Sequence, residues 1–432
     1  MEEKTKVLLV GVHVDGVYYF NQSMKELGKL AEACNMEVVG TVIQNMMQVN
    51  RALYLGTGKV KEVKQEAEAY NAEVVIFNNE LSPSQLRNLE SELDLPILDR
   101  TALILQIFAI RARTKEAKLQ VEVAKLGYML PRLVGLHESL GRQGGSAGTA
   151  NKGSGEKKLE LDRRKIEAKL NELKKELEDL KEQREIQRRK RKESDVPQVA
   201  LVGYTNAGKS TLLNALVDVY QEKNEKKVLE EDMLFATLET SIRNIVLEDN
   251  KSFLISDTVG FVSDLPHSLV KAFRSTLEEI KEADLLLHVV DYSDIEHERH
   301  MDVTTQVLKD LGAENIPVIY VYNKADKVES NLPIIDENKI YMSASNKIGL
   351  EELIEMIKDN VFSDYIKCRL MIPYAKADVL ALLNEVATIE GVDYIEQGNL
   401  VLAEIRKRDY YNFKQYDLKE EEKVTEEDLA DL

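Results

Sequence analysis

The chain has 432 residues, more than a single hydrophobic core usually holds, so we expect several domains. Its 44% hydrophobic and 31% charged residues, with no tryptophan, are typical of globular α/β domains and charged helices. No apolar run approaches the roughly 18 residues that a membrane-spanning helix needs, and the first residues do not resemble a signal peptide. We therefore expect no membrane span and a cytoplasmic location, with Cys34 and Cys368 as reduced structural thiols.

The formal net charge of −18 argues against general nucleic-acid binding, because phosphates attract basic surfaces. The charge is unevenly distributed, however. Residues 111–194 carry 23 lysines and arginines against 14 aspartates and glutamates, a net charge of +9. One basic segment therefore lies inside an acidic protein, and it is the part of the chain best suited to contact RNA.

Residues 1–112 alternate short apolar runs with helical patterns, which predicts a small α/β domain with a parallel sheet. Gly56-Thr57-Gly58-Lys59 opens one helix, and we interpret it as a helix-starting turn, with an anion site as the alternative. The predicted strands are Lys6–Val12, Glu37–Val42, Glu73–Phe77 and Leu95–Leu98, and the predicted helices are Ser23–Ala33, Lys59–Ala69, Ser82–Leu93 and Thr101–Ile110.

Residues 113–195 predict an antiparallel helical hairpin, packed as a coiled coil. The glycine-rich stretch Gly141–Gly155 between its helices is either a flexible linker or a tip that folds on a partner. The second helix ends in the cluster Arg188–Lys192, which is either a solvated helix end or a phosphate-contacting patch. The two apolar seams are Leu119, Val123, Leu126, Leu130 and Leu133, then Ile166, Leu170, Leu173, Leu177 and Leu180.

Residues 196–362 contain a phosphate-binding loop, with the pattern G-x-x-x-x-G-K-S between the apolar run Val199–Val202 and a helical pattern. Its glycines let backbone N–H groups turn inward, and the following helix directs its positive dipole end at the phosphates. Lys209 is expected to reach the β- and γ-phosphates, and the Ser210 hydroxyl to bind Mg²⁺. The residues expected to hold the phosphates are Gly203, Tyr204, Thr205, Asn206, Ala207, Gly208, Lys209, Ser210 and Thr211.

Further motifs follow the ends of predicted strands, where ligands bind in parallel sheets. In the D-T-V-G motif, the aspartate can hold Mg²⁺ through water and the glycine N–H can approach a γ-phosphate. In N-K-A-D, the Asp326 carboxylate can accept two hydrogen bonds from guanine, and S-A-S can close over the base. These motifs comprise Asp257, Thr258, Val259 and Gly260, then Asn323, Lys324, Ala325 and Asp326, then Ser343, Ala344 and Ser345.

The whole nucleotide-binding domain is predicted to be a doubly wound parallel sheet with one antiparallel strand. Its strands are expected over Val199–Val202, Ile242–Leu247, Phe253–Ser256, Leu285–Val290, Val318–Tyr322 and Lys339–Met342.

Residues 363–432 predict a small α+β domain. It begins with a strand from Tyr365, continues with a helix over Ala375–Thr388, and ends with two strands that turn at Gln397-Gly398-Asn399. The tail from Glu420 is strongly acidic. The overall fold class is thus α/β multidomain, with a helical hairpin between two α/β domains and an α+β domain at the end.

The order and spacing of the four nucleotide motifs resemble the Ras-like translation-factor class of GTPases. This resemblance implies that Mg²⁺ and GTP or GDP bind at the loop. It also implies a first switch over Leu234–Glu239, in which Thr237 is the second protein ligand of Mg²⁺. The switch residues placed beside the nucleotide are Phe235, Ala236, Thr237, Leu238 and Glu239.

Several specific motifs occur outside the nucleotide-binding domain: Asp99-Arg100-Thr101, Ile107–Glu122, Pro131-Arg132-Leu133, Arg142-Gln143-Gly144-Gly145 and Leu159–Arg164. By these motifs the chain resembles the HflX family, from about Leu55 through the nucleotide-binding domain. The resemblance implies a monomer that binds the large ribosomal subunit and its rRNA, inserts its hairpin and glycine-rich loop near the peptidyl transferase region, and splits or rescues stalled ribosomes or serves their biogenesis. One departure is Gly155–Glu160, which reads G-E-K-K-L-E where family members often have G-E-T-Q-L-E.

Hydrolysis of GTP is expected to depend on Lys209, Thr237 and Gly260, which surround the γ-phosphate. Phe261 follows Gly260 where many GTPases have a glutamine, and its ring cannot orient water, so we predict slow hydrolysis that a partner accelerates. We interpret His267 as a solvent-facing histidine of the switch, with a remote substitute for the glutamine as the alternative. Two other functions remain open: an RNA-remodelling ATPase with adenine bound near Gly56–Lys59, and a regulatory switch that recruits a protein through the hairpin.

Overall fold

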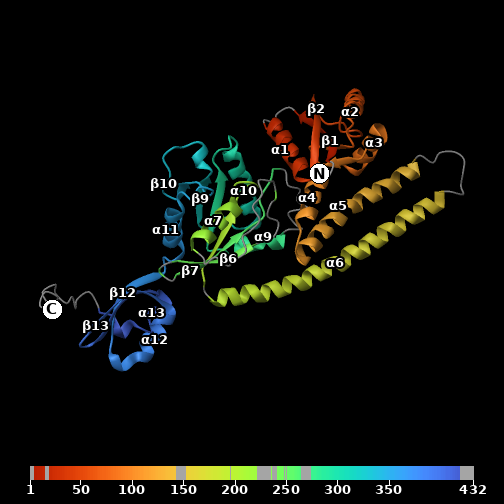
Figure 1. Ribbon diagram of the computed structural model, residues 1–432. Helices are drawn as coiled ribbons and strands as arrows, with labels where there is room; N and C mark the ends of the chain where they lie inside the picture. Colours follow the sequence, from red (N-terminus) through yellow and green to blue (C-terminus); the bar gives the residue numbers. More distant parts are fainter. Residues whose placement is uncertain are drawn as a thin grey trace.

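The computed structural model describes residues 4–14, 19–142, 152–194, 196–220, 235, 241–247, 249, 251–263 and 274–418. It has four parts (Figure 1): an N-terminal parallel sheet, a long helical hairpin, a mixed sheet with the phosphate loop, and a small antiparallel sheet. The N-terminal part lies beside the mixed sheet, the hairpin extends past the N-terminal part, and the small antiparallel sheet lies on the opposite side of the mixed sheet. This arrangement confirms the predicted α/β multidomain fold class. Within the described residues, no helix is both long enough and apolar enough to cross a membrane.

The N-terminal sheet has the strand order β2-β1-β3-β4 with every pair parallel, as predicted. Alternate residues of β1 enter opposite cores: Val7 and Leu9 pack under α1 and α4, whereas Leu8 and Val10 pack under α2 and α3. The elements are β1 Thr5–Val14, α1 Phe20–Ala33, β2 Met36–Met46, α2 Thr57–Ala69, β3 Val74–Phe77, α3 Pro83–Leu93, β4 Ile97–Asp99 and α4 Arg100–Arg111.

The predicted hairpin is formed by α5 Lys115–Arg142 and α6 Lys152–Ser194, which pack against each other. Residues 143–151 of the glycine-rich stretch lie outside the described residues, as do the side chains of Arg188–Lys192. The base of the hairpin is held by Asp99. This residue is fully buried and caps α4 by accepting from Ala102 N at 2.8 Å. The same carboxylate accepts from Leu81 N at 3.1 Å and from the Arg132 guanidinium of α5 at 3.0 Å. One acid therefore joins the N-terminal sheet to the hairpin.

In the described part of the chain, the central sheet has seven strands in the order β10-β11-β9-β8-β5-β7-β6. Both edge strands are antiparallel to their neighbours, so the prediction of one antiparallel strand was wrong. The antiparallel edge strand that was not predicted, β10, spans only Ile334–Asp336, which is too short for a strand pattern to be recognised in the sequence. The elements are β5 Gln198–Val202, α7 Lys209–Tyr220, β6 Ser241–Val246, β7 Ser252–Asp257, α9 Arg274–Lys281, β8 Leu285–Asp291, α10 His297–Leu311, β9 Val318–Asn323, the 3₁₀ turn η1 Ala325–Lys327, β10 Ile334–Asp336, β11 Lys339–Tyr341 and α11 Leu350–Val361.

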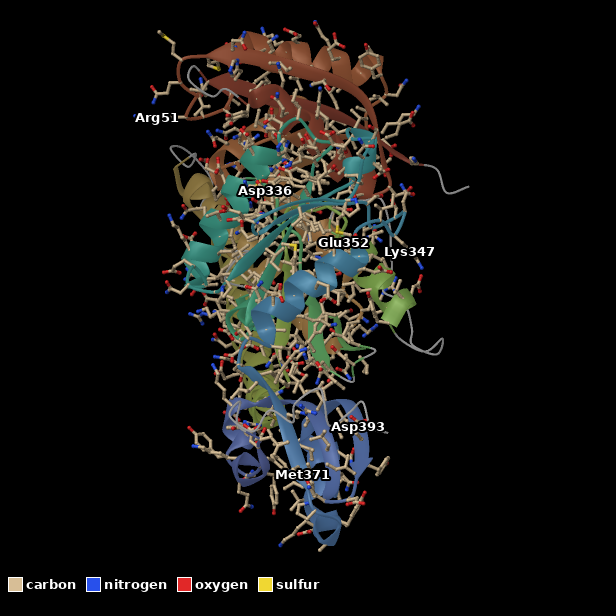
Figure 2. All side chains as sticks on the ribbon, turned by 90° about the vertical axis from the view of Figure 1, so that its left-hand side faces the viewer. Arg51, Asp336, Lys347, Glu352, Met371 and Asp393 are labelled. Atoms are coloured by element: carbon tan, nitrogen blue, oxygen red, sulfur yellow. The ribbon has the colours of Figure 1, made fainter. Side chains whose placement is uncertain are left out.

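The C-terminal sheet is antiparallel, with the order β12-β14-β13, and lies at the end of the molecule opposite Arg51 (Figure 2). The helix predicted over Ala375–Thr388 is shorter than expected, because Ala387 and Thr388 already pair with β14. Most of the acidic tail, from residue 419, lies outside the described residues. The elements are β12 Tyr365–Ile372, η2 Tyr374–Lys376, α12 Ala377–Val386, β13 Ala387–Ile395, β14 Gly398–Arg406, α13 Lys407–Tyr410 and η3 Lys414–Tyr416.

The N-terminal domain and the domain of the phosphate loop share one hydrophobic core. Tyr204, Phe235 and Val259 from the second domain pack with the buried residues of α1 and α4. The rings of Phe108 and Phe235 meet edge to face with centroids 4.7 Å apart. Because such pairs add to the gain from burial, the phosphate loop is held against the N-terminal domain rather than tethered to it.

The buried Asp99 leads to a stability prediction. In Asp99→Asn, the amide oxygen can still cap α4, but the charge that pairs with Arg132 is lost. We expect the full chain to lose about 2 kcal/mol of unfolding free energy, as for other hydrogen bonds to a charged group. Urea unfolding, together with hydrogen exchange of the α5 amides, measures this loss. Glu122→Gln, an exposed change on the same helix, should leave both unchanged, and equal stability of the two variants would contradict the assignment.

Candidate nucleotide site

The phosphate loop connects β5 to α7, and two of its glycines cannot be replaced. Gly203 has a φ of +147°, and a Cβ there would lie 2.2 Å from the Val289 carbonyl oxygen. Gly208 has a φ of +94°, and a Cβ there would lie 2.2 Å from Asn323 Nδ2. The neighbouring strand β8 and the end of β9 thus approach the loop so closely that only glycine fits.

Lys209, the first residue of α7, folds back over the loop. Its ammonium donates to the carbonyl oxygens of Gly203 at 3.1 Å and Tyr204 at 2.9 Å. Burial lowers the pKa of Lys209 to about 8, while the nearby Asp257 acts in the opposite direction. A cation held in this way is ready to bind phosphate oxygens, which would also restore its ordinary pKa.

The Ser210 hydroxyl donates to the Asp257 carboxylate at 2.6 Å. Asp257 ends β7 and is fully buried. A hydroxyl and a carboxylate oxygen at hydrogen-bond distance are the hard ligands that Mg²⁺ takes directly or through water, so the pair fits the expected metal. Thr237, the other expected ligand, lies outside the described residues, as do Ala236, Leu238 and Glu239.

The D-T-V-G segment runs directly beside the phosphate loop. A Cβ on Gly260 would lie 2.7 Å from Thr205 Cα and 3.0 Å from Lys209 Nζ, so Gly260 is at the point where a γ-phosphate is expected. The two segments exchange backbone hydrogen bonds, from Thr205 N to Phe261 O at 2.7 Å and from Phe261 N to Gly203 O at 3.2 Å. The Thr258 hydroxyl donates to Leu201 O at 2.6 Å, and Val259 packs into the core shared with the N-terminal domain.

The Phe261 side chain points away from the site into the core between the sheet and α9, and only 2% of it is exposed. It therefore takes no part in positioning water, in agreement with the reasoning from its chemistry. His267 lies outside the described residues.

The base-recognition motifs meet at the opposite end of the loop. Asn323 donates to Ala207 O at 3.0 Å and accepts from Ala344 N at 3.0 Å, which joins N-K-A-D, S-A-S and the phosphate loop. The Ser343 and Ser345 hydroxyls lie 3.3 Å apart in the loop that follows β11. Ala325 is buried at the start of η1, and the exposed Asp326 accepts from Asn346 Nδ2 at 3.1 Å.

Lys324 extends along the phosphate loop, donating to Asn206 O and to the Asp291 carboxylate, each at 2.8 Å. Burial alone would raise the pKa of Asp291, but the hydrogen bonds from Lys324 and Ser293 outweigh it and hold this pKa below its usual value.

Thr211 lies behind the loop in the first turn of α7, and the Phe235 N–H donates to the Thr205 hydroxyl at 2.8 Å. The structure therefore brings together every predicted site residue that it describes.

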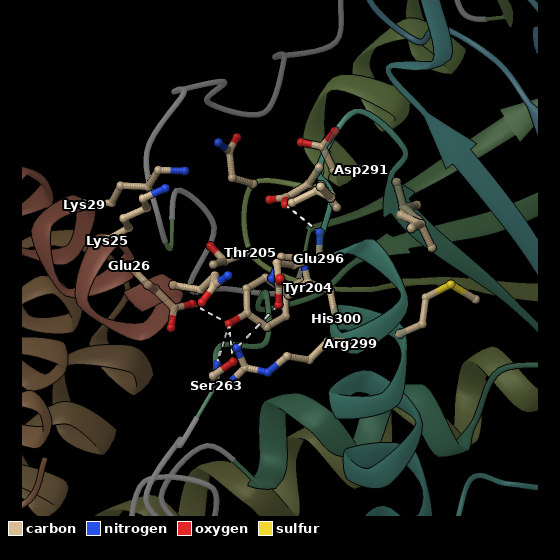
Figure 3. Close-up of a pocket in the computed structure, with 18 of the residues that line it drawn as sticks. Lys25, Glu26, Lys29, Tyr204, Thr205, Ser263, Asp291, Glu296, Arg299 and His300 are labelled. Atoms are coloured by element: carbon tan, nitrogen blue, oxygen red, sulfur yellow. Dashed lines mark hydrogen bonds and ion pairs between the residues drawn. The ribbon is translucent and has the colours of Figure 1, made fainter. Parts of the chain in front are cut away.

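A network around Tyr204 was not predicted from the sequence (Figure 3). The Tyr204 hydroxyl bonds the Glu26 carboxylate, lies 2.7 Å from the Ser263 hydroxyl, and accepts from Ser263 N at 2.6 Å. Arg100 completes the network by donating to Glu26 and, at 3.1 Å, to Ser263 O. The His300 ring stacks on Tyr204 with centroids 3.8 Å apart. Since these partners come from distant segments, the sequence offered no signal beyond the Asp99-Arg100-Thr101 motif.

The second short glycine motif, Gly56–Lys59, starts α2, which confirms its interpretation as a helix-starting turn. The Gly56 N–H donates to the Gln44 side chain at 2.9 Å, and Lys59 pairs with Glu62 at 2.8 Å. The groups that would bind an anion there are thus already engaged within the N-terminal domain.

Three family descriptions match consecutive parts of the chain. Residues 21–109 match the "GTP-binding GTPase N-terminal" family, and residues 111–191 match the "GTP-binding GTPase Middle Region". Residues 198–324, which include the phosphate loop and Asn323-Lys324, match the "50S ribosome-binding GTPase" family. The matches extend from the N-terminal sheet through the hairpin into the central sheet.

Individual relatives give the same result over most of the chain. A protein named GTPase HflX from Caldanaerobacter subterraneus is 46% identical, and the match covers 89% of this chain and 87% of that protein. GTPase HflX from Escherichia coli is 36% identical over 90% of this chain and 91% of its own. Among solved structures, a GTP-binding protein of Sulfolobus solfataricus in complex with GDP matches with 25% identity and a TM-score of 0.44, covering 84% of this chain and 99% of that one.

The burial of Lys209 makes nucleotide binding depend on pH. Bound phosphates require the charged ammonium, whereas the free site has a Lys209 pKa of about 8, so binding above that pH must take up a proton. We expect the Kd for GDP to be about tenfold higher at pH 9 than at pH 7, from one proton per site. Titration with a fluorescent nucleotide at fixed Mg²⁺ measures this. Lys59→Gln should keep the wild-type profile, and a constant Kd would contradict the assignment.

Proposed function

Since the chain belongs to the HflX family of GTPases, we propose that it binds Mg²⁺ and GTP at the loop Gly203–Ser210 and uses GTP hydrolysis to act on the large ribosomal subunit. The single observation that carries the proposal is the arrangement of the site. Groups suited to the terminal phosphate, namely Lys209 and Gly260, lie at one end of the loop, and groups suited to guanine lie at the other.

Guanine recognition is assigned to Asp326. Asn323 fixes the end of β9 through hydrogen bonds to Ala207 and Ala344. The turn η1 that follows therefore places the Asp326 carboxylate beside the S-A-S loop. A carboxylate accepts both N–H groups on the edge of guanine, whereas adenine offers no such pair. Lys324, held by Asn206 and Asp291, supplies a flat aliphatic stem along which the base can lie.

The Ser210 hydroxyl and the Asp257 carboxylate would hold Mg²⁺, with Thr237 as a further ligand. When bound, the ion neutralises charge on the β- and γ-phosphates. In the protein itself, Lys209 stabilises the charge that develops on the transferred phosphoryl group, and the Gly260 N–H fixes its orientation. The backbone bonds between Thr205 and Phe261 keep Gly260 beside Lys209.

Water activation is the incomplete part of this site. Phe261 is buried away from the loop, so the residue after Gly260 provides no hydrogen bond to a nucleophilic water. Slow hydrolysis by the protein alone follows from this. A bound partner would accelerate the reaction by ordering the segments that complete the site.

The hairpin is the part proposed to contact the large subunit and its rRNA. With 43 residues, α6 is about 65 Å long at 1.5 Å per residue. The hairpin therefore extends past the N-terminal domain (Figure 1). Residues 111–194 carry a net charge of +9 in a chain of net charge −18, so RNA phosphates attract this segment while the acidic remainder is repelled. Such an extended cationic arm suits insertion between RNA elements, which supports a role in ribosome splitting, rescue or biogenesis.

Base recognition can be tested with Asp326→Asn. The asparagine oxygen can still accept from one guanine N–H, but the NH2 group opposes the other and can instead donate to the extra carbonyl of xanthine. We expect GTP affinity to fall about 100-fold and xanthosine triphosphate to become the preferred ligand, because one hydrogen bond is replaced by two opposed donors and the other loses its charged acceptor. Competition binding measures both. Asp336→Asn on β10, exposed and paired only with Lys339 in the described structure, should bind GTP as the wild type does.

Dependence on the large subunit can be tested with single-turnover GTP hydrolysis. We expect the rate to rise at least about tenfold when purified large subunits are added, since the protein alone lacks a water-orienting side chain. Small subunits are the matched control. Equal rates with and without large subunits would contradict the proposal, and co-sedimentation with GDP, GTP and a non-hydrolysable analogue shows which nucleotide state binds.

A further inference from the structure

A cavity of about 250 Å³ lies between the N-terminal domain and the phosphate loop (Figure 3). Its walls come from α1, from the loop residues Thr205 and Asn206, and from the chain between the end of β8 and the first turn of α10. The base-recognition residue Asp326 is not among the residues that line it. The cavity therefore adjoins the phosphate end of the site rather than the guanine end.

Thr205 marks the side of the loop nearest the terminal phosphate. Gly260, the residue expected at the γ-phosphate, approaches Thr205 so closely that a Cβ would lie 2.7 Å from Thr205 Cα. The same Cβ would lie 3.0 Å from the Lys209 ammonium. A positive group that enters the cavity from α1 is therefore directed at the terminal phosphate, and not at the ribose or base.

The helix α1 cannot easily move away from this position. Its Glu26 bonds both the Tyr204 hydroxyl of the loop and the Arg100 guanidinium of α4. Arg100 is only 2% exposed, and Tyr204 only 7%. A charged pair buried in this way is costly to break, so α1 keeps a fixed place beside the loop.

Two lysines on this helix have no ion-pair or hydrogen-bond partner among the residues that the structure describes. Lys25 and Lys29 are exposed and four residues apart, so they lie on one face of α1, and both line the cavity. In Figure 3 both side chains extend from α1 toward the side where Thr205 lies. Within the part of the chain that the structure describes, neither makes an ion pair or a hydrogen bond.

Three of the four carboxylates that line the same cavity pair with a cation: Glu26 with Arg100, Asp291 with Lys324, and Glu296 with Arg299 at 3.9 Å. The fourth, Asp294, accepts from Glu296 N at 3.0 Å and has no cationic partner among the described residues. Two lysines against this one unpaired carboxylate leave a net positive charge beside the phosphate loop, and therefore a local positive potential. This potential favours the ligand with the larger negative charge.

We propose that Lys25 and Lys29 of the N-terminal domain bind the terminal phosphate of GTP and make the site discriminate GTP from GDP. The inference rests on the proposed function and adds to it a contribution from the other domain. GTP carries one more negative charge than GDP, and that charge is located at the end of the nucleotide that faces α1. The lysines act as point charges from across the cavity, so they add to the contacts of Lys209 without replacing them.

The test compares the full-length wild type with the double variant Lys25→Gln/Lys29→Gln. The Kd values of a non-hydrolysable GTP analogue and of GDP are measured at low and high salt. We expect the Kd of the analogue to rise about fivefold, because two exposed charges contribute a binding free energy of that modest size. The Kd of GDP should change less than twofold. The fivefold effect should shrink at high salt, because screening weakens the interaction.

Two further double variants serve as controls. Lys61→Gln/Lys118→Gln removes the same charge from exposed positions on α2 and α5 and should leave both Kd values unchanged. Lys25→Arg/Lys29→Arg keeps the charge and should restore the preference for the analogue. An unchanged ratio of the two Kd values in Lys25→Gln/Lys29→Gln, or an equal change in the control pair, would overturn the inference. Wild type that binds neither nucleotide would instead refute the proposed function.

Discussion

The hydroxyl of Tyr204 is the contact on which the relation between the two α/β domains depends. Tyr204 belongs to the phosphate loop, yet its ring is buried in the core of the N-terminal domain and its hydroxyl bonds Glu26 and Ser263. Burial, followed by the charge of Glu26, raises the pKa of Tyr204, so the phenol stays neutral and acts as a donor. A buried polar group must keep its partners. The phosphate loop, the segment after Gly260 and α1 are thereby held in one arrangement.

Asp99 and Arg100 extend this arrangement to the hairpin. They are adjacent in sequence, at the junction of β4 and α4, and their side chains go to different parts of the molecule. Asp99 holds Arg132 of α5, whereas Arg100 holds Glu26 and the Ser263 carbonyl beside the nucleotide site. Both side chains are buried and hydrogen-bonded. The junction of β4 and α4 therefore contacts both the segment beside the nucleotide site and the base of the hairpin.

Charge is arranged in the same way at two scales. The whole protein is acidic, with a basic hairpin as its exception. In the cavity beside the phosphate loop, three of the four lining carboxylates pair with cations, while Lys25 and Lys29 have no partner among the described residues. In each case positive charge exceeds the unpaired negative charge nearby. Positive potential is therefore confined to the surfaces proposed to meet phosphates, which limits binding elsewhere.

The sequence by itself determined the phosphate loop, the order of the nucleotide motifs, the parallel N-terminal sheet and the hairpin, because each depends on local spacing or on periodicity of apolar residues. It missed β10, which at three residues is too short to show a strand pattern, and the early end of α12, where pairing with β14 overrides helix propensity. Only the tertiary structure decided which side chains meet across domains. Tyr204 and Glu26 are 178 residues apart, and their contact follows from how two folded surfaces pack rather than from any local preference. The placement of Lys25 and Lys29 beside Thr205 follows from the same packing.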